Sequence, residues 1–204
     1  MNIYCTEINF NLHPLRGNFN PLFLPQISHQ LLDVKTFLNP QIGNLLKNLG
    51  VYIYIIEAFS QWKYPWTNYI HVDSQGQDIG KINWVFGGKD SYNQWFQIKP
   101  GSEGTPSITQ ANTGSVRYTL DEVDQTLYTY HARNLPFVFQ AGIPHCAIPS
   151  ENPRCCISLV PKWIHNHQSL KYSECVDLFL SYLVADAGLE PTTGAYETPE
   201  IPLL

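Results

Sequence analysis

Between residues 51 and 161 the chain is a succession of short apolar segments, rich in Val, Ile, Tyr, Phe and Trp and bounded by turn residues. Such segments predict β-strands, because branched and aromatic side chains pack well on a pleated surface. A chain of many short strands folds as a β-sandwich or barrel. The expected strands are 51–59, 67–73, 80–88, 92–98, 116–120, 127–132, 135–142, 145–149 and 154–161, with a polar loop over 100–115.

Helical segments are expected on either side of these strands. Residues 28–38 and 40–49 predict two helices, the second with Pro40 in its first turn and Gly50 as its end. Residues 175–187 predict a C-terminal helix. We therefore expect one mainly β (α+β) domain. Its parts are a helical N-terminal support over 1–50, a β core over 51–165, a supporting helix within 170–190 and an irregular tail over 191–204.

Charge and composition exclude several classes of protein. There are 17 acidic and 12 basic residues and no block of basic residues, so we expect no nucleic-acid partner. No segment reaches the roughly 18 to 20 apolar residues of a membrane helix, and the N-terminus does not read as a signal peptide. We expect a cytoplasmic protein without a membrane partner. Five cysteines without a C-x-x-C pair suit neither a disulfide framework nor a zinc ribbon, and we interpret them as reduced thiols.

Three residues predict a metal site. His71 and Asp73 stand two positions apart at the end of an expected strand, so their side chains project from the same face. His145 follows a Gly-x-Pro turn and begins a later strand. Two imidazoles and one carboxylate form the facial triad that holds non-haem Fe(II) and leaves coordination positions open. The alternative is a hydrogen-bonded pair at a strand end with His145 in a turn. His165 and His167 are a rival metal pair, but their segment has the character of a loop.

A cation follows the triad. Arg154 stands nine residues after His145 and begins a strand on which Arg154 and Ser158 share a face. An arginine with a neighbouring hydroxyl is well suited to bind a carboxylate. The turn between His145 and Arg154 is short, so we expect their strands to be neighbours. Lys81 is the rival cation, although its place beside a glycine near a strand start favours a solvated side chain. Asn83 is a further polar candidate on that strand.

The order His71-x-Asp73, His145, Arg154 resembles the Fe(II)- and 2-oxoglutarate-dependent oxygenase superfamily. The segments INWVFGG (82–88) and IPHCAIPSENPRCCISLVP (143–161) are similar to stretches of its small microbial and phage-encoded members. The resemblance implies a double-stranded β-helix, a jelly-roll or cupin-like core. It also implies catalytic Fe(II) bound by the two histidines and Asp73, and O2 and 2-oxoglutarate as co-substrates. Arg154, Ser158 and Asn83 would bind the 2-oxoglutarate.

The resemblance implies oxidation of a substrate coupled to decarboxylation of 2-oxoglutarate to succinate and carbon dioxide. Some halogenating relatives carry a small residue in place of the carboxylate, whereas this chain has Asp73, so hydroxylation is expected. The expected substrate is a small molecule, an amino acid or a peptide side chain. Two alternatives stay open: a cupin-like metal enzyme that does not use 2-oxoglutarate, and a non-catalytic β-sandwich such as a binding or virion module.

Overall fold

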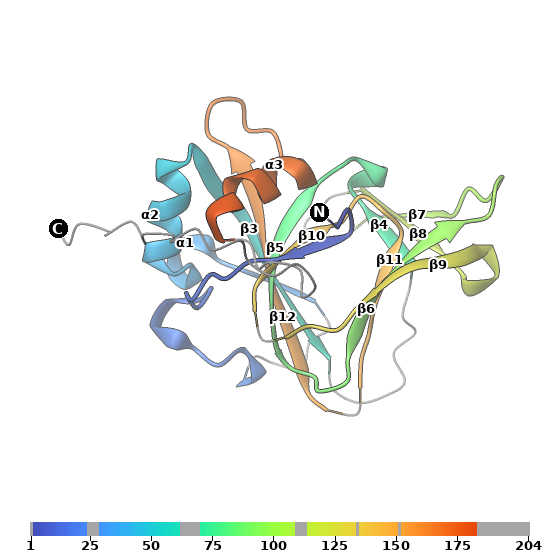
Figure 1. Ribbon diagram of the computed structural model, residues 1–204, viewed down its shortest axis with the longest axis horizontal. Helices are drawn as coiled ribbons and strands as arrows, with labels where there is room; N and C mark the ends of the chain where they lie inside the picture. Colours follow the sequence, from blue (N-terminus) through green and yellow to red (C-terminus); the bar gives the residue numbers. More distant parts are fainter. Residues whose placement is uncertain are drawn as a thin grey trace, which may run out of the picture.

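The computed structural model describes residues 2–23, 29–61, 70–108, 114–133, 135–150 and 152–182. Figure 1 shows two antiparallel sheets packed face to face, with the helices gathered on one side. Each sheet has six strands. The prediction of a mainly β protein is confirmed, and the arrangement is that of a β-sandwich.

The two sheets draw their strands from widely separated parts of the chain. The first sheet has the order β1 (Cys5–Glu7), β10 (Phe137–Gln140), β5 (Gly80–Gly87), β12 (Arg154–Trp163), β3 (Val51–Gln61) and β2 (Gln30–Leu32). The second has the order β7 (Thr105–Ile108), β8 (Gly114–Tyr118), β4 (Ile70–Asp73), β11 (His145–Ile148), β6 (Tyr92–Ile98) and β9 (Val123–Tyr130).

The helices agree with the sequence only in part. Helix α2 (Pro40–Asn48) is confirmed, and the side chain of Asn39 caps it by accepting a hydrogen bond from the Gln41 amide. The predicted helix over 28–38 is wrong, because β2 and the single turn α1 (Val34–Phe37) occupy its described part. Strand β2 pairs with the edge of β3, which satisfies its backbone without a helix.

The C-terminal helix begins earlier and is shorter than expected. Helix α3 spans Tyr172–Leu178 and is followed by a 3-10 turn, Leu180–Tyr182. The predicted helix over 175–187 therefore overlaps it only in part. Residues 183–187 of that segment, and the predicted tail over 191–204, lie outside the described residues.

Three strands were not expected. Besides β2, strand β1 lies within the first 50 residues, so this region, which also contains α1 and α2, is helical only in part. Strand β7 lies within the predicted loop over 100–115 and pairs with β8. These strands have three or four residues and few β-branched or aromatic side chains, so their sequences do not predict a strand. They are strands because they pair with neighbouring strands; in β1, for example, Cys5 lies opposite Phe139 of β10, which is distant in the sequence.

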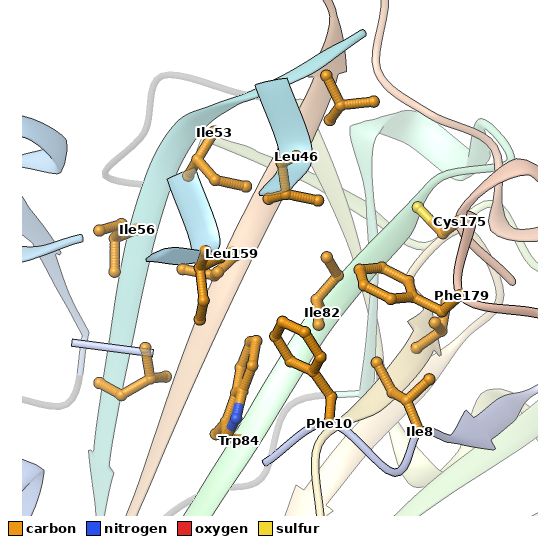
Figure 2. Packing of buried hydrophobic residues seen from close by; sticks show 14 of the residues in the cluster. Ile8, Phe10, Leu46, Ile53, Ile56, Ile82, Trp84, Leu159, Cys175 and Phe179 are labelled. Atoms are coloured by element: carbon orange, nitrogen blue, oxygen red, sulfur yellow. The ribbon is translucent and has the colours of Figure 1, made fainter. Parts of the chain in front are cut away.

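The main hydrophobic core lies between the first sheet and the helices. Alternate residues of β3, β5 and β12 point to this side, and residues of α2 and α3 pack against them, as Figure 2 shows. Full burial of a Val, Leu, Ile, Phe or Met side chain stabilises a fold by roughly 1.5–3 kcal/mol relative to leaving it exposed. The core includes Ile42, Leu46, Ile53, Ile56, Ala58, Ile82, Trp84, Ile157, Leu159, Cys175, Val176 and Phe179.

A second, smaller cluster fills part of the space between the two sheets. It contains Trp95 of β6, Phe137 and Phe139 of β10, and Cys156 of β12. The indole N–H of Trp95 donates to the backbone carbonyl oxygen of Gln140 at 2.9 Å, which ties the two sheets together. Other inward-facing positions carry buried polar and charged side chains, among them Glu57, Lys81, Asn83, Arg154 and Ser158.

Two sequence expectations concern the chain as a whole. All five cysteines are buried and have free thiols. In the parts of the chain that the structure describes, no helix is both long and apolar enough to cross a membrane.

Candidate metal centre

The structure brings His71, Asp73 and His145 together on the inner face of the second sheet. Strands β4 and β11 run antiparallel with His145 directly opposite His71, and the two imidazole rings have centroids 4.4 Å apart. The metal-binding atoms of the three side chains all lie within 4.8 Å of one another. Among the described residues this is the only such group of three, and neither His165 nor His167 belongs to one.

The surroundings of His145 fix which ring nitrogen is available. Its Nδ1 lies 2.8 Å from the backbone carbonyl oxygen of Ile143, which only accepts hydrogen bonds, so Nδ1 carries the proton. The lone pair of Nε2 is then free to bind a metal. Burial, together with neighbouring His71, lowers the pKa of His145 to about 3. The ring is therefore neutral at physiological pH, as a metal ligand must be.

The backbone amide and both carboxylate oxygens of Asp73 have partners that fix its position. Its amide donates to the carbonyl oxygen of Ala141 at 3.0 Å. Its Oδ1 lies 3.8 Å from Nε2 of His71, and its Oδ2 lies 2.7 Å from Nζ of Lys81. Burial alone would raise the pKa of Asp73, but Lys81 and the two histidines outweigh it and hold the pKa below its usual range. The carboxylate is therefore ionised.

This donor set fits a divalent metal ion. It offers two imidazole nitrogens and one carboxylate oxygen, the combination that non-haem Fe(II) takes with positions to spare. Bonds of about 2.1 Å bring one ion within reach of all three after small side-chain rotations. The side chain of His71 is 33% exposed, whereas that of Asp73 is 13% exposed. The site therefore opens towards solvent on the side of His71.

Lys81 and Glu57 form a buried ion pair behind Asp73. Lys81 Nζ lies 2.7 Å from Glu57 Oε2 and 2.7 Å from Asp73 Oδ2. The expectation of a solvated Lys81 is wrong: the residue is 7% exposed, because it faces the sandwich interior from β5. Burial alone would lower the pKa of Lys81, but the carboxylates of Asp73 and Glu57 outweigh it and raise the pKa.

Sequence reasoning missed Glu57. It lies on β3 and is 5% exposed, and its Oε1 lies 3.3 Å from Nε2 of His29. The signal was present, because an isolated glutamate within the apolar run VYIYIIEAF requires a buried partner. Nothing in the sequence pointed to His29, whose ring stacks on Phe59 with centroids 4.6 Å apart.

Arg154 also points into the space between the sheets. It begins β12, is 2% exposed, and its Nη2 lies 3.4 Å from Oδ1 of Asn93 on β6. The expectation that its strand neighbours that of His145 is wrong, because the turn between them crosses from one sheet to the other. Gly88, with φ of 63°, makes room for it: a Cβ there would lie 2.7 Å from the Arg154 side chain.

Ser158 and Asn83 lie on the same face of the first sheet as Arg154, the face towards the second sheet. Ser158 stands on β12 directly opposite Asn83 of β5 and Glu57 of β3. Ser158 Oγ, Asn83 Oδ1 and, from the facing sheet, Asn93 Nδ2 are buried polar atoms that have no hydrogen-bond partner in the structure. Such atoms are costly to bury unpaired, so their gathering in one interior is typical of a site that receives a polar ligand.

Comparison with known proteins identified no relative of this chain. A scan against protein-family models matched no family, and searches of the curated proteins and of the solved structures found no match.

Proposed function

We propose that this protein is an Fe(II)- and 2-oxoglutarate-dependent dioxygenase that hydroxylates a small molecule, an amino acid or a peptide side chain, with release of succinate and carbon dioxide. The observation that carries the proposal is the meeting of His71, Asp73 and His145 in one sandwich interior into which Arg154 also points. An N,N,O metal site and a buried guanidinium are together suited to bind an α-keto diacid.

The strand order supports a double-stranded β-helix as the finer description of the fold. In chain order, β3, β5, β10 and β12 belong to the first sheet, and β4, β6, β9 and β11 to the second. Within the sheets they are ordered β10-β5-β12-β3 and β4-β11-β6-β9, the pairing scheme of a jelly roll. The metal ligands then lie on its second and seventh strands, and Arg154 on its eighth.

In this proposal His71, Asp73 and His145 bind Fe(II) and leave positions open on the exposed side of His71. Bound iron supplies the activation of O2 together with 2-oxoglutarate, and the protein supplies geometry and a dry interior. Apolar rings assist in excluding water: Phe139 packs edge-on against His145 with centroids 4.8 Å apart. Phe139 in turn contacts Trp95.

Arg154 binds the distal carboxylate of 2-oxoglutarate by charge-assisted hydrogen bonds. The unsatisfied Ser158 Oγ and Asn93 Nδ2 are two further donors from opposite sheets. Asn83 Oδ1 is an acceptor, so this atom would meet a donor such as a water molecule rather than the carboxylate itself. Burial lowers the pKa of Arg154, which means that the interior disfavours its charge and that a bound anion would compensate it.

An anaerobic titration tests the proposal. Metal-free protein is loaded with Fe(II), 2-oxoglutarate is added without O2, and the visible absorption spectrum is compared with that of Asp73→Ala treated in the same way. We expect a visible band from the chelated keto acid in the native protein and none in the variant. Screening amino acids and peptides for faster succinate release then identifies the substrate class.

The alternatives give different results. Metal binding that depends on Asp73, without a spectral response to 2-oxoglutarate, would indicate a cupin-like metal enzyme and overturn the proposed co-substrate. No metal binding by the native protein would overturn the proposal altogether and leave a non-catalytic β-sandwich.

A further inference from the structure

Three charged side chains, those of Glu57, Lys81 and Asp73, form a row between the two sheets, and metal coordination accounts only for Asp73. Lys81 of β5 contacts Glu57 of β3 in its own sheet and Asp73 of β4 in the facing sheet, at 2.7 Å each. Three ionised groups in a largely buried space are expensive in free energy, and well-packed apolar residues would serve stability better. The row therefore requires a reason other than folding.

The two oxygens of Asp73 have separate partners. Oδ2 is taken by the Lys81 ammonium group, while Oδ1 faces the imidazole of His71. A metal bound by the two histidines and Asp73 therefore meets one carboxylate oxygen, because the other is engaged in a charge-assisted hydrogen bond. Without Lys81 the second oxygen would be free to bind the same metal.

Charge gives Lys81 and Glu57 opposite effects on a metal ion. Lys81 contacts the metal ligand Asp73 directly and repels a divalent cation, whereas Glu57 is linked to Asp73 through the Lys81 ammonium group and attracts the cation from a greater distance. Because Coulomb energy falls with distance, the repulsion by Lys81 exceeds the attraction by Glu57. Glu57 in turn holds the ammonium group in place.

We propose that Lys81, oriented by Glu57, is a positioning residue that makes Asp73 a one-oxygen ligand and weakens metal binding, so that coordination positions stay open. The inference rests on the metal site of the proposed function and adds to it a control of affinity and coordination number. It predicts that removing Lys81 strengthens metal binding, whereas a purely structural residue would weaken binding when lost.

The test compares three variants of the full chain: Lys81→Met, Glu57→Gln, and the two combined. Co(II) dissociation constants are measured by calorimetry, and visible Co(II) absorption reports the coordination number. The double variant removes the Lys81 and Glu57 charges together, so Glu57 is not left as a buried carboxylate without its ammonium partner. Lys89→Met, in the exposed turn after β5, is the matched control for loss of a positive charge.

We expect Lys81→Met and the double variant to bind Co(II) about tenfold to a hundredfold more tightly, with a changed absorption spectrum as Oδ2 joins the metal. Glu57→Gln should bind more weakly with an unchanged spectrum, and Lys89→Met should behave as the native protein. If Lys81→Met binds Co(II) as the native protein does or more weakly, the inference is overturned while the proposed metal site stands. If the native protein binds no Co(II), the proposed function itself fails.

Discussion

The two faces of the first sheet are built from neighbouring residues and have opposite character. On β3, Ile56 faces the helices and Glu57 faces the second sheet; on β12 the same holds for Leu159 and Ser158. On β5, buried Lys81 points inward beside Ile82, which belongs to the helix-side core. The face towards the helices therefore stabilises the fold, whereas the face towards the second sheet carries the charged groups that form the site.

Burial affects the apolar side chains of the helix side and the charged side chains of the inner side differently. Burying apolar side chains on the helix side is favourable at about 25 cal/mol per Å² of apolar surface. On the inner side, Lys81, Glu57 and Arg154 lose hydration on burial, so their charges depend on the partners that folding brings to them. We therefore expect substitutions on the helix side to change stability, and substitutions on the inner side to change binding and activity.

The largest effect is expected for Asp73→Ala on the inner face. It removes one of three metal ligands, so succinate formation should disappear, while circular dichroism stays native because Lys81 keeps its partner Glu57. Succinate release with the best substrate is the measurement, with Asp124→Ala on exposed β9 as the control. Full turnover by Asp73→Ala would show that this carboxylate is not a ligand.

Next in size is Leu159→Ala on the helix face. Leu159 is fully buried, and its truncation leaves a cavity that should lower the free energy of unfolding by about 2–5 kcal/mol. Urea unfolding measures the loss, and metal affinity should stay native. Leu120→Ala, at a residue 76% exposed, should change stability by less than about 0.5 kcal/mol. Equal losses in the two variants would contradict the comparison of the faces.

Arg154→Ala is expected to separate binding of the co-substrate from binding of the metal. Losing a charge-assisted contact to a buried carboxylate costs roughly 2–4 kcal/mol, a weakening of about thirtyfold to a thousandfold in apparent 2-oxoglutarate affinity. Fe(II) binding should remain native.

Arg133→Ala is the matched control, because the side chain of Arg133 is 70% exposed. Succinate formation is followed against 2-oxoglutarate concentration for both variants and for Lys81→Met. If Lys81→Met raises the 2-oxoglutarate requirement and Arg154→Ala does not, then Lys81 and not Arg154 binds the co-substrate, although the oxygenase proposal survives.

The smallest effect is a pH dependence of stability that the inner face imposes on the metal-free protein. Burial lowers the pKa of His145 to about 3 from its ordinary 6.5, so below pH 6.5 the unfolded chain binds a proton that the folded protein does not. The free energy of unfolding should therefore fall as pH decreases from 6.5 to 3, by at most about 1.4 kcal/mol per pH unit. The lowered pKa of Asp73 acts in the same direction at more acidic pH.

Urea unfolding of metal-free native protein and of His145→Gln, measured from neutral pH downwards, checks this expectation. The variant should show the shallower slope just below pH 6.5, where His145 takes up a proton in the unfolded chain but not in the folded protein. Parallel slopes would mean that His145 is not buried as a neutral ring.

The sequence predicted the parts of the fold that depend on local pattern. Strands β3, β5, β6 and β12 are long enough to show β-branched and aromatic enrichment between turn residues, and α2 carries its own start and stop signals. Strands β1, β2 and β7 were missed because these short segments, CTE, QLL and TPSI, lack the β-branched and aromatic enrichment of the predicted strands. Pairing with a distant strand, which no local pattern encodes, is what makes them strands.

Within the site, sequence alone determined that His71 and Asp73 share a face, because strand geometry sets that alternation over two residues. Only the tertiary structure decided that His145 lies opposite His71, that Lys81 is buried between two carboxylates, and that Arg154 enters the same interior from the other sheet. These relations depend on which strands pair and which faces meet. Those choices follow from the burial of the whole chain, since the free energy of a charged side chain is set by the partners that folding brings to it.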